Sequence, residues 1–387
     1  MIYLLVKLHY AMLEAHRLGF LRVFTDVTFQ TAMATLTSFV IVILFGPRTI
    51  RWLRRKKIGD RPSFDQEQMD KLMEGKKGTP TMGGVLVISA IAITVLLLAD
   101  LSNFYVRMAL VCLVWLGGLG AVDDWLKLTG HARGAGSRQG LAGWEKLLFQ
   151  IGLAVVLCVF TYRYSTIDAS HTFFFPFFKS AQLLLPLWAF VLLGTLVLTG
   201  SSNAVNLTDG LDGLAAGCVG IASFAFVILA LIAGSDEFSV SGRSLTQYLY
   251  LPHIPASGQM AVLAGAMLGA CLGFLWFNCT PAQVFMGDTG SLALGGLLGY
   301  IAIVIRQELL LLIVGGVFAA EAISVMLQVG WFKYTRRKYG QGRRIFLMSP
   351  LHHHFQKLNW SEAQVVVRFW LVGAMLAMMA LATVKIR

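Results

Sequence analysis

Ten long apolar stretches constrain this chain more than any other feature of its sequence. Most are about 17–25 residues long, the length at which an α-helix crosses the apolar core of a bilayer. Hydrophobic residues make up 57% of the 387 residues and charged residues only 13%, which excludes an ordinary soluble domain. We therefore predict an all-α integral membrane protein with about ten transmembrane helices. The stretches are 24–46, 82–99, 105–122, 147–162, 183–200, 213–233, 259–277, 289–305, 309–332 and 362–384.

The distribution of Lys and Arg predicts which side of the membrane each loop faces. The loops 48–78, 123–146 and 333–357 together hold twenty-one of these residues, whereas the loops on the opposite side hold five. Since positively charged loops stay in the cytoplasm, these three loops are predicted to be cytoplasmic. An even number of spans then puts both termini on the periplasmic side. The net charge of +12 is thus mainly a signal of topology.

We expect one polytopic membrane domain over residues 1–387, with an apolar N-terminal segment at 1–22. A cleavable signal peptide is not expected, because the first nineteen residues carry charged groups and lead directly into a full-length span. The basic run from Arg51 to Lys57 could also hold anionic lipid headgroups. Five segments are predicted to meet on the cytoplasmic face and to form the functional site: 48–81, 123–146, 201–212, 278–291 and 333–361.

Five aspartates lie at the predicted cytoplasmic ends of the apolar stretches. A carboxylate in the apolar zone costs roughly 2.5–3.5 kcal/mol even on a lenient insertion scale, so a cluster of them marks an ion or substrate site. A single aspartate at such a place is more simply a solvated helix end. Five on one face predict a buried acidic site instead. They are Asp123, Asp124, Asp209, Asp212 and Asp288.

A polar stripe is expected in the segment NAVNLTDGLDGL. Asn206, Asp209 and Asp212 recur every three residues, so on a helix they would share one face. Gly210 and Gly213 would let a ligand or a neighbouring backbone approach closely. Hydrogen bonding between helices is an alternative use of such a stripe, but two carboxylates and an amide within seven residues favour a binding site.

The segment NCTPAQVFMGDTGSL surrounds Asp288 with glycine and hydroxyl residues. At a helix start these residues offer backbone N–H groups to phosphate, and the aspartate can hold a metal ion. Phe285 could stack on a base, although aromatic residues in membrane proteins often only pack. Asn278 and Ser291, at the two ends of the segment, are further candidates for substrate contacts.

Basic groups complete the predicted site. Lys76 and Lys77 precede a Gly- and Pro-rich segment, GTPTMGG, which contains Thr81 and suits a loop that contacts phosphate. His352, His353 and His354 lie in the last basic loop. Three histidines could ligate a metal, but beside oxygen ligands we expect imidazole to donate hydrogen bonds to phosphate.

Together these groups predict a reaction type. Oxygen ligands without a Cys and His cage favour Mg²⁺ over zinc, and Mg²⁺ with Lys and His indicates a diphosphate substrate. A site at the membrane surface is accessible to a group carried by a lipid. We therefore expect phosphoryl transfer between a soluble nucleotide-type donor and a lipid acceptor.

Five motifs resemble, in order, the signatures of the phospho-N-acetylmuramoyl-pentapeptide-transferase family. The resemblance runs from about residue 46 to the C-terminus, and the histidine motif is similar to the muramyl branch of the wider polyprenyl-phosphate N-acetylhexosamine-1-phosphate transferase superfamily. The glycine-rich segment 130–144 departs from the family pattern. The motifs are KKGTPTMGG (76–84), VDDW (122–125), NLTDGLDG (206–213), FMGDTGSL (285–292) and SPLHHHF (349–355).

The resemblance implies a specific activity. The enzyme would transfer phospho-MurNAc-pentapeptide from UDP-MurNAc-pentapeptide to undecaprenyl phosphate, giving lipid I and UMP, in the first membrane step of peptidoglycan synthesis. It would require Mg²⁺, lie as a homodimer in the bacterial inner membrane and bind no nucleic acid. The ninth span, with Gly315, Gly316 and Glu321, would be a broken helix beside a groove for the polyprenyl chain. The residues do not reveal a partner for the buried Glu321.

The resemblance also implies residue roles. Asp288 would ligate Mg²⁺, Asp123 and Asp124 would activate the acceptor or attack, and Lys76 would lie near the diphosphate. Asp209 and Asp212 would lie with Asn206 on the nucleotide side, and Phe285 would stack on uracil. The remaining residues expected to contact the donor or another part of the substrates are Thr81, Asn278, Ser291, His352, His353 and His354.

Two alternatives remain open from the sequence. A sister enzyme would use UDP-GlcNAc as donor. A cation-coupled transporter would place its carboxylates near the bilayer midplane, usually on broken helices, rather than at one membrane face. The order of chemical steps is also open, since an aspartate could attack first and form a phospho-enzyme, although an anionic lipid phosphate is itself an adequate nucleophile.

Overall fold

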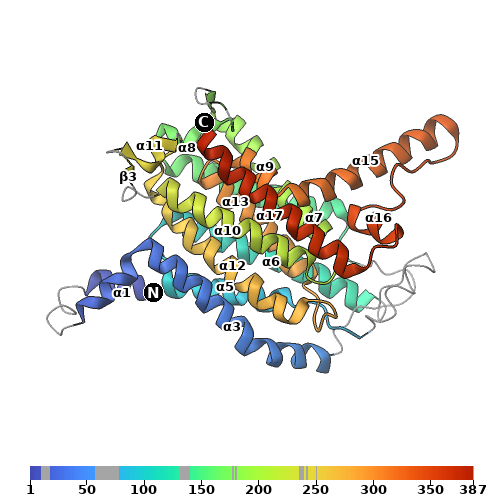
Figure 1. Ribbon diagram of the computed structural model, residues 1–387, viewed down its shortest axis with the longest axis horizontal. Helices are drawn as coiled ribbons and strands as arrows, with labels where there is room; N and C mark the ends of the chain where they lie inside the picture. Colours follow the sequence, from blue (N-terminus) through green and yellow to red (C-terminus); the bar gives the residue numbers. More distant parts are fainter. Residues whose placement is uncertain are drawn as a thin grey trace.

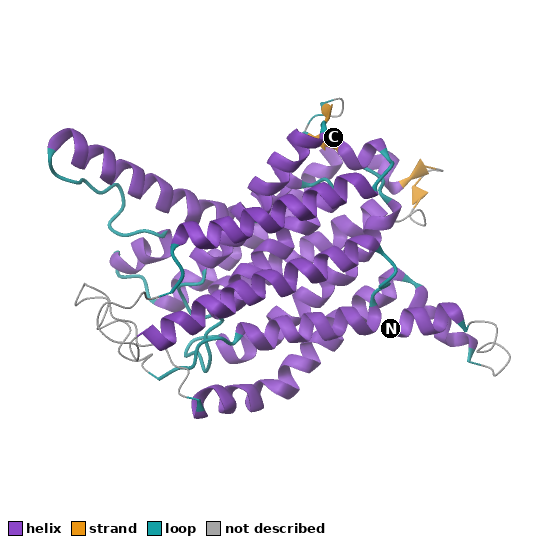
Figure 2. Cartoon of the chain, turned by 180° about the vertical axis from the view of Figure 1, so that it is seen from behind, coloured by secondary structure: helices purple, strands orange, loops and turns teal. Residues whose placement is uncertain are grey.

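The computed structural model describes residues 1–9, 18–56, 78–130, 140–176, 178, 181–234, 239–240, 243–249 and 251–386. Within these residues the chain is a bundle of long helices with two small hairpins (Figures 1 and 2). Lys76 and Lys77 lie outside the described residues, as does most of the glycine-rich segment 130–144.

Eight helices in the described part of the chain are long and apolar enough to cross a bilayer. This confirms the prediction of an all-α integral membrane protein. Each corresponds to one of the predicted apolar stretches. The helices are α3 (Val27–Arg55), α6 (Phe104–Gly130), α7 (Gly143–Tyr164), α9 (Leu187–Thr208), α10 (Leu214–Gly234), α12 (Gln259–Asn278), α13 (Gly287–Val304) and α17 (Glu362–Ile386).

The two remaining stretches differ from simple spans. The stretch 309–332 lies in α14 (Glu308–Val314) and α15 (Gly316–Tyr339), which are bent by 86° and make a ninth span only if counted together. The stretch 82–99 forms α5 (Gly84–Leu98), whose 15 residues extend about 22 Å at the usual helical rise, short of a full span. At the start of α5 the backbone N–H groups of Gly83 and Gly84 donate to the carbonyls of Phe285 and Met286.

Short elements gather at one end of the bundle, where Figure 1 also places both chain termini. β1 pairs antiparallel with β2, with Thr172 opposite Leu184, and β3 pairs antiparallel with β4. The opposite end, which we call the site end, carries α16 (Leu351–Lys357). The short elements are α1 (Ile2–Leu8), η1 (Gly19–Thr25), α8 (Asp168–His171), β1 (Thr172–Phe174), β2 (Gln182–Leu184), β3 (Ser239–Val240), β4 (Arg243–Ser244), α11 (Leu245–Leu249) and η4 (Pro255–Gly258).

α13 lies at the centre of the bundle and positions the site. Every residue from Thr289 to Val304 is buried, and α6 and α9 pack along its length. α6 approaches the first turn of α13 very closely at Gly120, where an added Cβ would overlap the carbonyl oxygen of Asp288. Small residues allow such close contact between membrane helices. As a result, the last turns of α6 lie directly beside the start of α13.

Candidate active site

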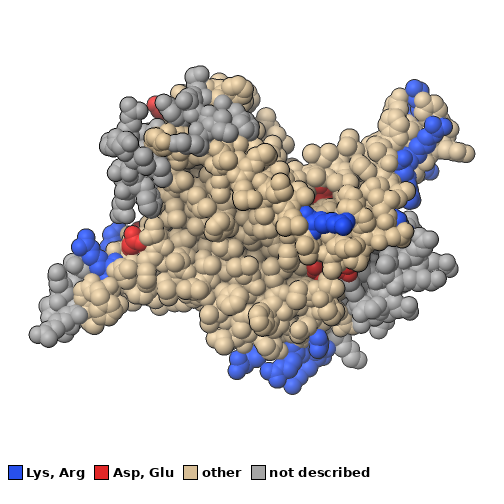
Figure 3. Space-filling model, viewed as in Figure 1, with Lys and Arg blue, Asp and Glu red and all other residues tan. Residues whose placement is uncertain are grey.

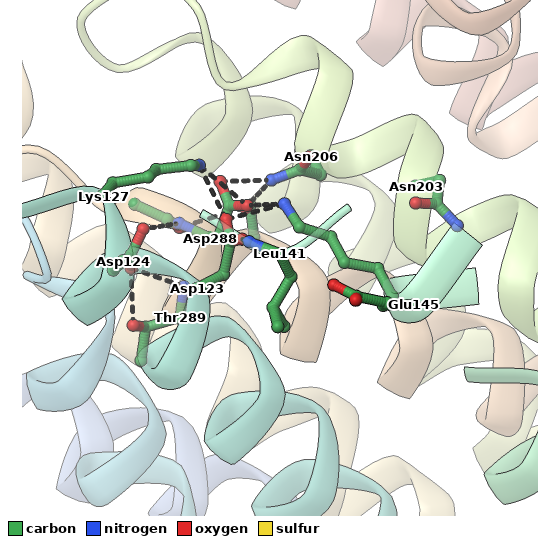
Figure 4. Close-up of polar contacts among 12 residues, drawn as sticks. Asp123, Asp124, Lys127, Leu141, Glu145, Asn203, Asn206, Asp288 and Thr289 are labelled. Carbon is green, nitrogen blue, oxygen red and sulfur yellow. Dashed lines mark hydrogen bonds and ion pairs between the residues drawn. The ribbon is translucent and has the colours of Figure 1, made fainter. Parts of the chain in front are cut away.

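Three carboxylates meet at the site end of the bundle. Asp123 and Asp124 come from α6 and Asp288 from the first turn of α13, and one oxygen from each lies within 4.8 Å of the others. We call these three residues the acidic cluster. Asp123 and Asp124 are buried, whereas Asp288 is partly accessible. Figure 4 shows the side chains pointing toward one another from the two helices.

Asp124 caps the N-terminus of α13. Its carboxylate accepts hydrogen bonds from the backbone N–H groups of Asp288 (3.1 Å) and Thr289 (2.9 Å) and from the Thr289 hydroxyl (2.6 Å). The first N–H groups of a helix have no partner within the helix, and a negative charge there also interacts favourably with the helix dipole. Asp124 therefore fixes the position of Asp288.

Gly287 makes this cap possible. Its φ angle is +76°, in the left-handed region that favours glycine. A Cβ at this position would lie 2.7 Å from Asp124 Oδ2 and 3.1 Å from Thr81 Oγ1, so no larger residue fits without displacing the carboxylate. Thr81, a predicted substrate contact, thus lies beside the start of α13.

Two lysines bridge the acidic cluster. Lys127 Nζ lies 2.8 Å from Asp123 Oδ2 and 3.1 Å from Asp288 Oδ2, and Lys146 Nζ lies 2.6 Å and 2.7 Å from the same two oxygens. Their charges lower the cost of holding buried carboxylates together. The Lys127 side chain is 45% exposed and that of Lys146 only 17%, so Lys127 reaches the cluster from its accessible side.

Neither lysine was singled out from the sequence. Lys127 follows Asp123 by four residues on α6, a spacing that places two side chains on one helix face, and this signal could have identified it. Lys146 comes from α7, twenty-three residues beyond Asp123, and no local pattern in the sequence connects them.

The other oxygens of Asp123 and Asp288 also have partners. The Leu141 backbone N–H donates to Asp123 Oδ1 (2.7 Å), and Asn206 Nδ2 donates to Asp288 Oδ1 (2.9 Å). Asn206 Nδ2 also lies 2.9 Å from the hydroxyl of Ser291. The structure therefore places the predicted residues Asn206 and Ser291 beside the acidic cluster.

The polar stripe expected in the segment 203–214 is interrupted. α9 ends at Thr208, so Asp209 and Asp212 do not continue one helical face, and the predicted loop 201–212 is mostly the end of this helix. Asp209 is partly buried directly after the helix. Burial, and then the negative charges of Asp288 and Asp124, raise the pKa of Asp209 to about 8.

Asp212 and Asn278 contact backbone groups around the α12–α13 loop. Asp212 Oδ2 accepts from the Ala282 N–H (3.0 Å). Asn278 accepts from the Gly213 N–H (3.0 Å) and donates to the Val284 carbonyl (2.8 Å). Both side chains are buried. They hold the loop that precedes α13 against the start of α10 (Leu214–Gly234) and so support the acidic cluster indirectly.

Phe285 joins this loop to the segment before α5. Its backbone N–H donates to the Pro80 carbonyl, and its own carbonyl accepts from the Gly83 N–H, both at 2.8 Å. The Phe285 ring is half-buried. The segment that contains Thr81 therefore lies against the segment that leads into Asp288.

Comparison with known families identifies this arrangement. Residues 106–306, just over half of the chain, match the model of glycosyl transferase family 4. The chain belongs to this family. Residues 76–88 match signature 1 of phospho-N-acetylmuramoyl-pentapeptide-transferase, which confirms the resemblance found in the sequence. The protein is thus a polyprenyl-phosphate sugar-1-phosphate transferase of that type, and both matches favour this class over the transporter hypothesis.

The three histidines of the transferase have separate surroundings. His352 is buried against Glu321 of α15, and Glu321 Oε1 lies 3.2 Å from its Nδ1. His353 Nδ1 contacts Gln356 Oε1 (2.8 Å). His354 Nδ1 accepts from the Leu347 N–H (3.2 Å). The motif therefore includes one imidazole that is tied to a buried carboxylate.

The acidic cluster of the transferase fits a hard divalent cation. Its potential ligands are carboxylate oxygens, which Mg²⁺ prefers. Asp123 Oδ2 and Asp288 Oδ2 are contacted, among the described residues, by lysine ammonium groups. The combined charge of the two lysines equals that of one divalent cation, so a cation can neutralise these oxygens while the lysines turn toward an anionic substrate.

Proposed function

We propose that this transferase moves phospho-MurNAc-pentapeptide from UDP-MurNAc-pentapeptide to undecaprenyl phosphate, giving lipid I and UMP. This would be the first membrane step of peptidoglycan synthesis, carried out at the bacterial inner membrane with Mg²⁺. The observation that carries the proposal is the acidic cluster with Lys127 and Lys146, which joins three carboxylates and two ammonium groups at one end of a membrane bundle. The signature match supports the muramyl donor.

Asp288 and Asp123 are the residues that would hold Mg²⁺. When bound, the ion would neutralise the donor diphosphate and stabilise the charge that develops on the transferred phosphoryl group. Asp288 is the more accessible of the two, which suits a ligand that an incoming ion must reach. Asp124 would act as a positioning residue, because its oxygens bind the start of α13.

Lys127 and Lys146 would contact the phosphates of the donor. Their ammonium groups lie on Asp123 and Asp288, and a cation at these carboxylates would free the lysines to pair with the diphosphate. Lysine is a flexible point charge that suits this exchange of partners. Lys76, implied by the family resemblance, would add a further positive charge from the segment before Thr81.

A single displacement is the favoured chemistry. An oxygen of undecaprenyl phosphate would attack the β-phosphorus of the donor, the bond from that phosphorus to the bridging oxygen would break, and UMP would leave. The lipid phosphate is already an anion. Asp123 and Asp124 are buried, and each carboxylate accepts several hydrogen bonds or ion pairs, which weakens either as a nucleophile in a double displacement.

Release of UMP tests the proposal. Purified protein would be given undecaprenyl phosphate with UDP-MurNAc-pentapeptide or UDP-GlcNAc, in Mg²⁺ or in EDTA. We expect UMP and a lipid-linked sugar only with the muramyl donor and Mg²⁺. Turnover of UDP-GlcNAc instead would assign the protein to the sister branch. A phosphorylated aspartate trapped without acceptor would contradict the single displacement.

Two further expectations belong to this proposal. The loops of the site end should be cytoplasmic and both termini periplasmic, which labelling of single cysteines from one side of intact cells would test. The homodimer implied by the family resemblance would be tested by the mass of the purified protein in detergent. Either measurement is independent of catalytic activity.

A further inference from the structure

α15 leaves the helical bundle. It is 24 residues long and follows an 86° bend after α14, and Figures 1 and 2 show it projecting away from the other helices. Its middle part exposes large apolar side chains, with Met326 65%, Leu327 51% and Trp331 43% exposed. In a membrane protein such a surface faces lipid, because water would make its exposure unfavourable.

The end of this helix is strongly basic. No Asp or Glu occurs in the sequence between Glu321 and Glu362. Figure 3 shows Lys and Arg gathered at the far end of the projecting helix. We call this set the basic tip: Lys333, Arg336, Arg337, Lys338, Arg343 and Arg344.

Aromatic rings lie among these cations. Lys338 Nζ is 5.6 Å from the ring centre of Tyr334 and 5.3 Å from that of Tyr339. The Arg343 guanidinium also lies 5.3 Å from the centre of the Tyr339 ring. Tyrosine and tryptophan beside Lys and Arg are typical of the depth where a helix passes from hydrocarbon to headgroups.

A pocket of about 320 Å³ lies between α15 and the segment 343–349. Lys333 and Arg344 line it together with the apolar side chains of Val329, Phe332 and Met348. Positive groups beside apolar walls suit a ligand that joins an anionic group to a hydrocarbon chain. The pocket therefore has the chemistry of a site for a lipid phosphate.

Hydrogen bonds hold the pocket in shape. Gln328 accepts from the backbone N–H groups of Ile345 and Phe346, both at 3.0 Å, and donates to the Phe346 carbonyl (3.2 Å). The buried Thr335 hydroxyl accepts from the Arg343 N–H (2.8 Å). A site that is already ordered needs little reorganisation when its ligand binds.

We propose that this pocket and the basic tip bind the headgroup phosphate of an anionic phospholipid in the leaflet at the site end. The occupant is a bulk membrane lipid and not the polyprenyl acceptor of the reaction. Charge complementarity favours it, since anionic lipids attract clusters of Lys and Arg next to the membrane surface. Lysine and arginine also supply donors for the phosphate oxygens.

Lipid binding at this site would act on the histidine motif. α15 carries Glu321, which contacts His352. It also carries Gln328 and Thr335, which hold the segment that leads to the histidine motif. Seating the basic tip on headgroups would therefore fix the orientation of α15 and, through these contacts, of His352. Anionic lipid is expected to increase activity as well as to bind.

The test compares lipid retention by native mass spectrometry in mixed phosphatidylglycerol and phosphatidylcholine bilayer discs. In K333Q/R344Q the preference for phosphatidylglycerol should fall about thirtyfold, the order expected for two interfacial cations. Both side chains are exposed, so this variant should fold normally. R107Q/R163Q is the control, because it removes the same charge from exposed positions on α6 and α7, outside the pocket and the basic tip. It should retain the preference.

Three outcomes would overturn the proposal. Equal loss in K333Q/R344Q and R107Q/R163Q would show that retention reflects general positive charge. Unchanged retention in K333Q/R344Q would exclude a lipid phosphate from the pocket. Unchanged retention with a raised KM for the nucleotide donor would assign the pocket to an anionic part of that donor. Because lipid retention is measured without turnover, the result does not depend on the proposed reaction.

Discussion

Glu321 and His352 are joined by two contacts in the interior of the protein. Glu321 Oε1 lies 3.2 Å from His352 Nδ1 and 3.1 Å from the His352 backbone nitrogen. A carboxylate oxygen accepts, so this contact suits the tautomer with the hydrogen on Nδ1. His352 Nε2 lies close to Gly210, where an added Cβ would overlap it, and has no hydrogen-bond partner among the described residues. Glu321 thus orients an imidazole whose second nitrogen remains available.

Glu321→Gln should lower activity much more than stability. The amide oxygen can still accept from the His352 backbone, so the melting temperature should change little. The charge that orients the ring is lost, and kcat should fall by about tenfold or more. Measurement of kcat and thermal unfolding for E321Q, H352Q and the double variant would check this. The double variant should lose no more than H352Q alone, and additive losses would contradict coupling between the two residues.

Asp124→Asn should mainly impair stability, whereas Asp288→Asn should mainly impair turnover. Asp124→Asn weakens the cap of α13 and should lower the free energy of unfolding by roughly 0.5–2 kcal/mol. Asp288→Asn should leave that stability nearly unchanged but abolish turnover that depends on Mg²⁺. Thermal unfolding and UMP release would be measured on both variants. Near-normal turnover by Asp288→Asn would exclude it as a metal ligand.

Gly287→Ala should destabilise the start of α13. The residue has φ +76°, and its Cβ would crowd Asp124 Oδ2, so we expect a loss of about 1–3 kcal/mol together with reduced activity. Gly118→Ala is the matched control, because that position on α6 has nothing within 4 Å of an added Cβ. It should be neutral or slightly stabilising. Equal effects of the two substitutions on thermal unfolding would contradict the assignment.

Lys146→Met should make stability depend on metal. Removing this ammonium group leaves Asp123 and Asp288 with less compensating charge, which should cost about 1–3 kcal/mol in EDTA. Mg²⁺ should restore much of that loss. Lys127→Met should cost less, since the Lys127 side chain is 45% exposed and that of Lys146 only 17%. If Mg²⁺ shifted the melting temperature of neither variant and not of the unaltered protein, no cation site would exist at the cluster.

Particular residues show how far the sequence could predict this structure. Apolar length predicted the spans because crossing a bilayer sets helix length directly. It did not predict the bond between the Gly83 N–H, at the start of the short helix α5, and Phe285, because that is a contact between distant segments. The spacing of Asn206, Asp209 and Asp212 indicated one shared face, but α9 ends at Thr208. Gly210, two residues after that end, is a local stop signal that the spacing alone does not take into account.

Side-chain partners were the least predictable part of the site. The five aspartates and Asn206 were recognised because polar groups at the ends of apolar stretches are energetically costly and therefore indicate a functional site. Lys146 escaped notice because its link to Asp123 depends on how α7 packs against α6. The partner of Glu321 was also hidden, since His352 lies thirty-one residues further along the chain and meets it only in the folded protein. The kind of chemistry could be predicted from local sequence patterns, whereas the partners of the side chains could be identified only from the tertiary fold.

The raised pKa of Asp209 predicts how stability and metal affinity change with pH. Its pKa is about 8 in the folded protein, against an ordinary value of 3.8. Between these values the folded state holds a proton that the unfolded state has lost, so without metal this group makes stability fall as pH rises toward 8. A cation at the acidic cluster favours the Asp209 carboxylate, so metal binding should release a proton, and affinity should rise up to about pH 8 and then level off. Thermal unfolding with and without Mg²⁺ at pH 6, 7 and 8 would measure both trends. Asp209→Asn should flatten them, and an unaltered pH dependence in that variant would assign the trends to another group.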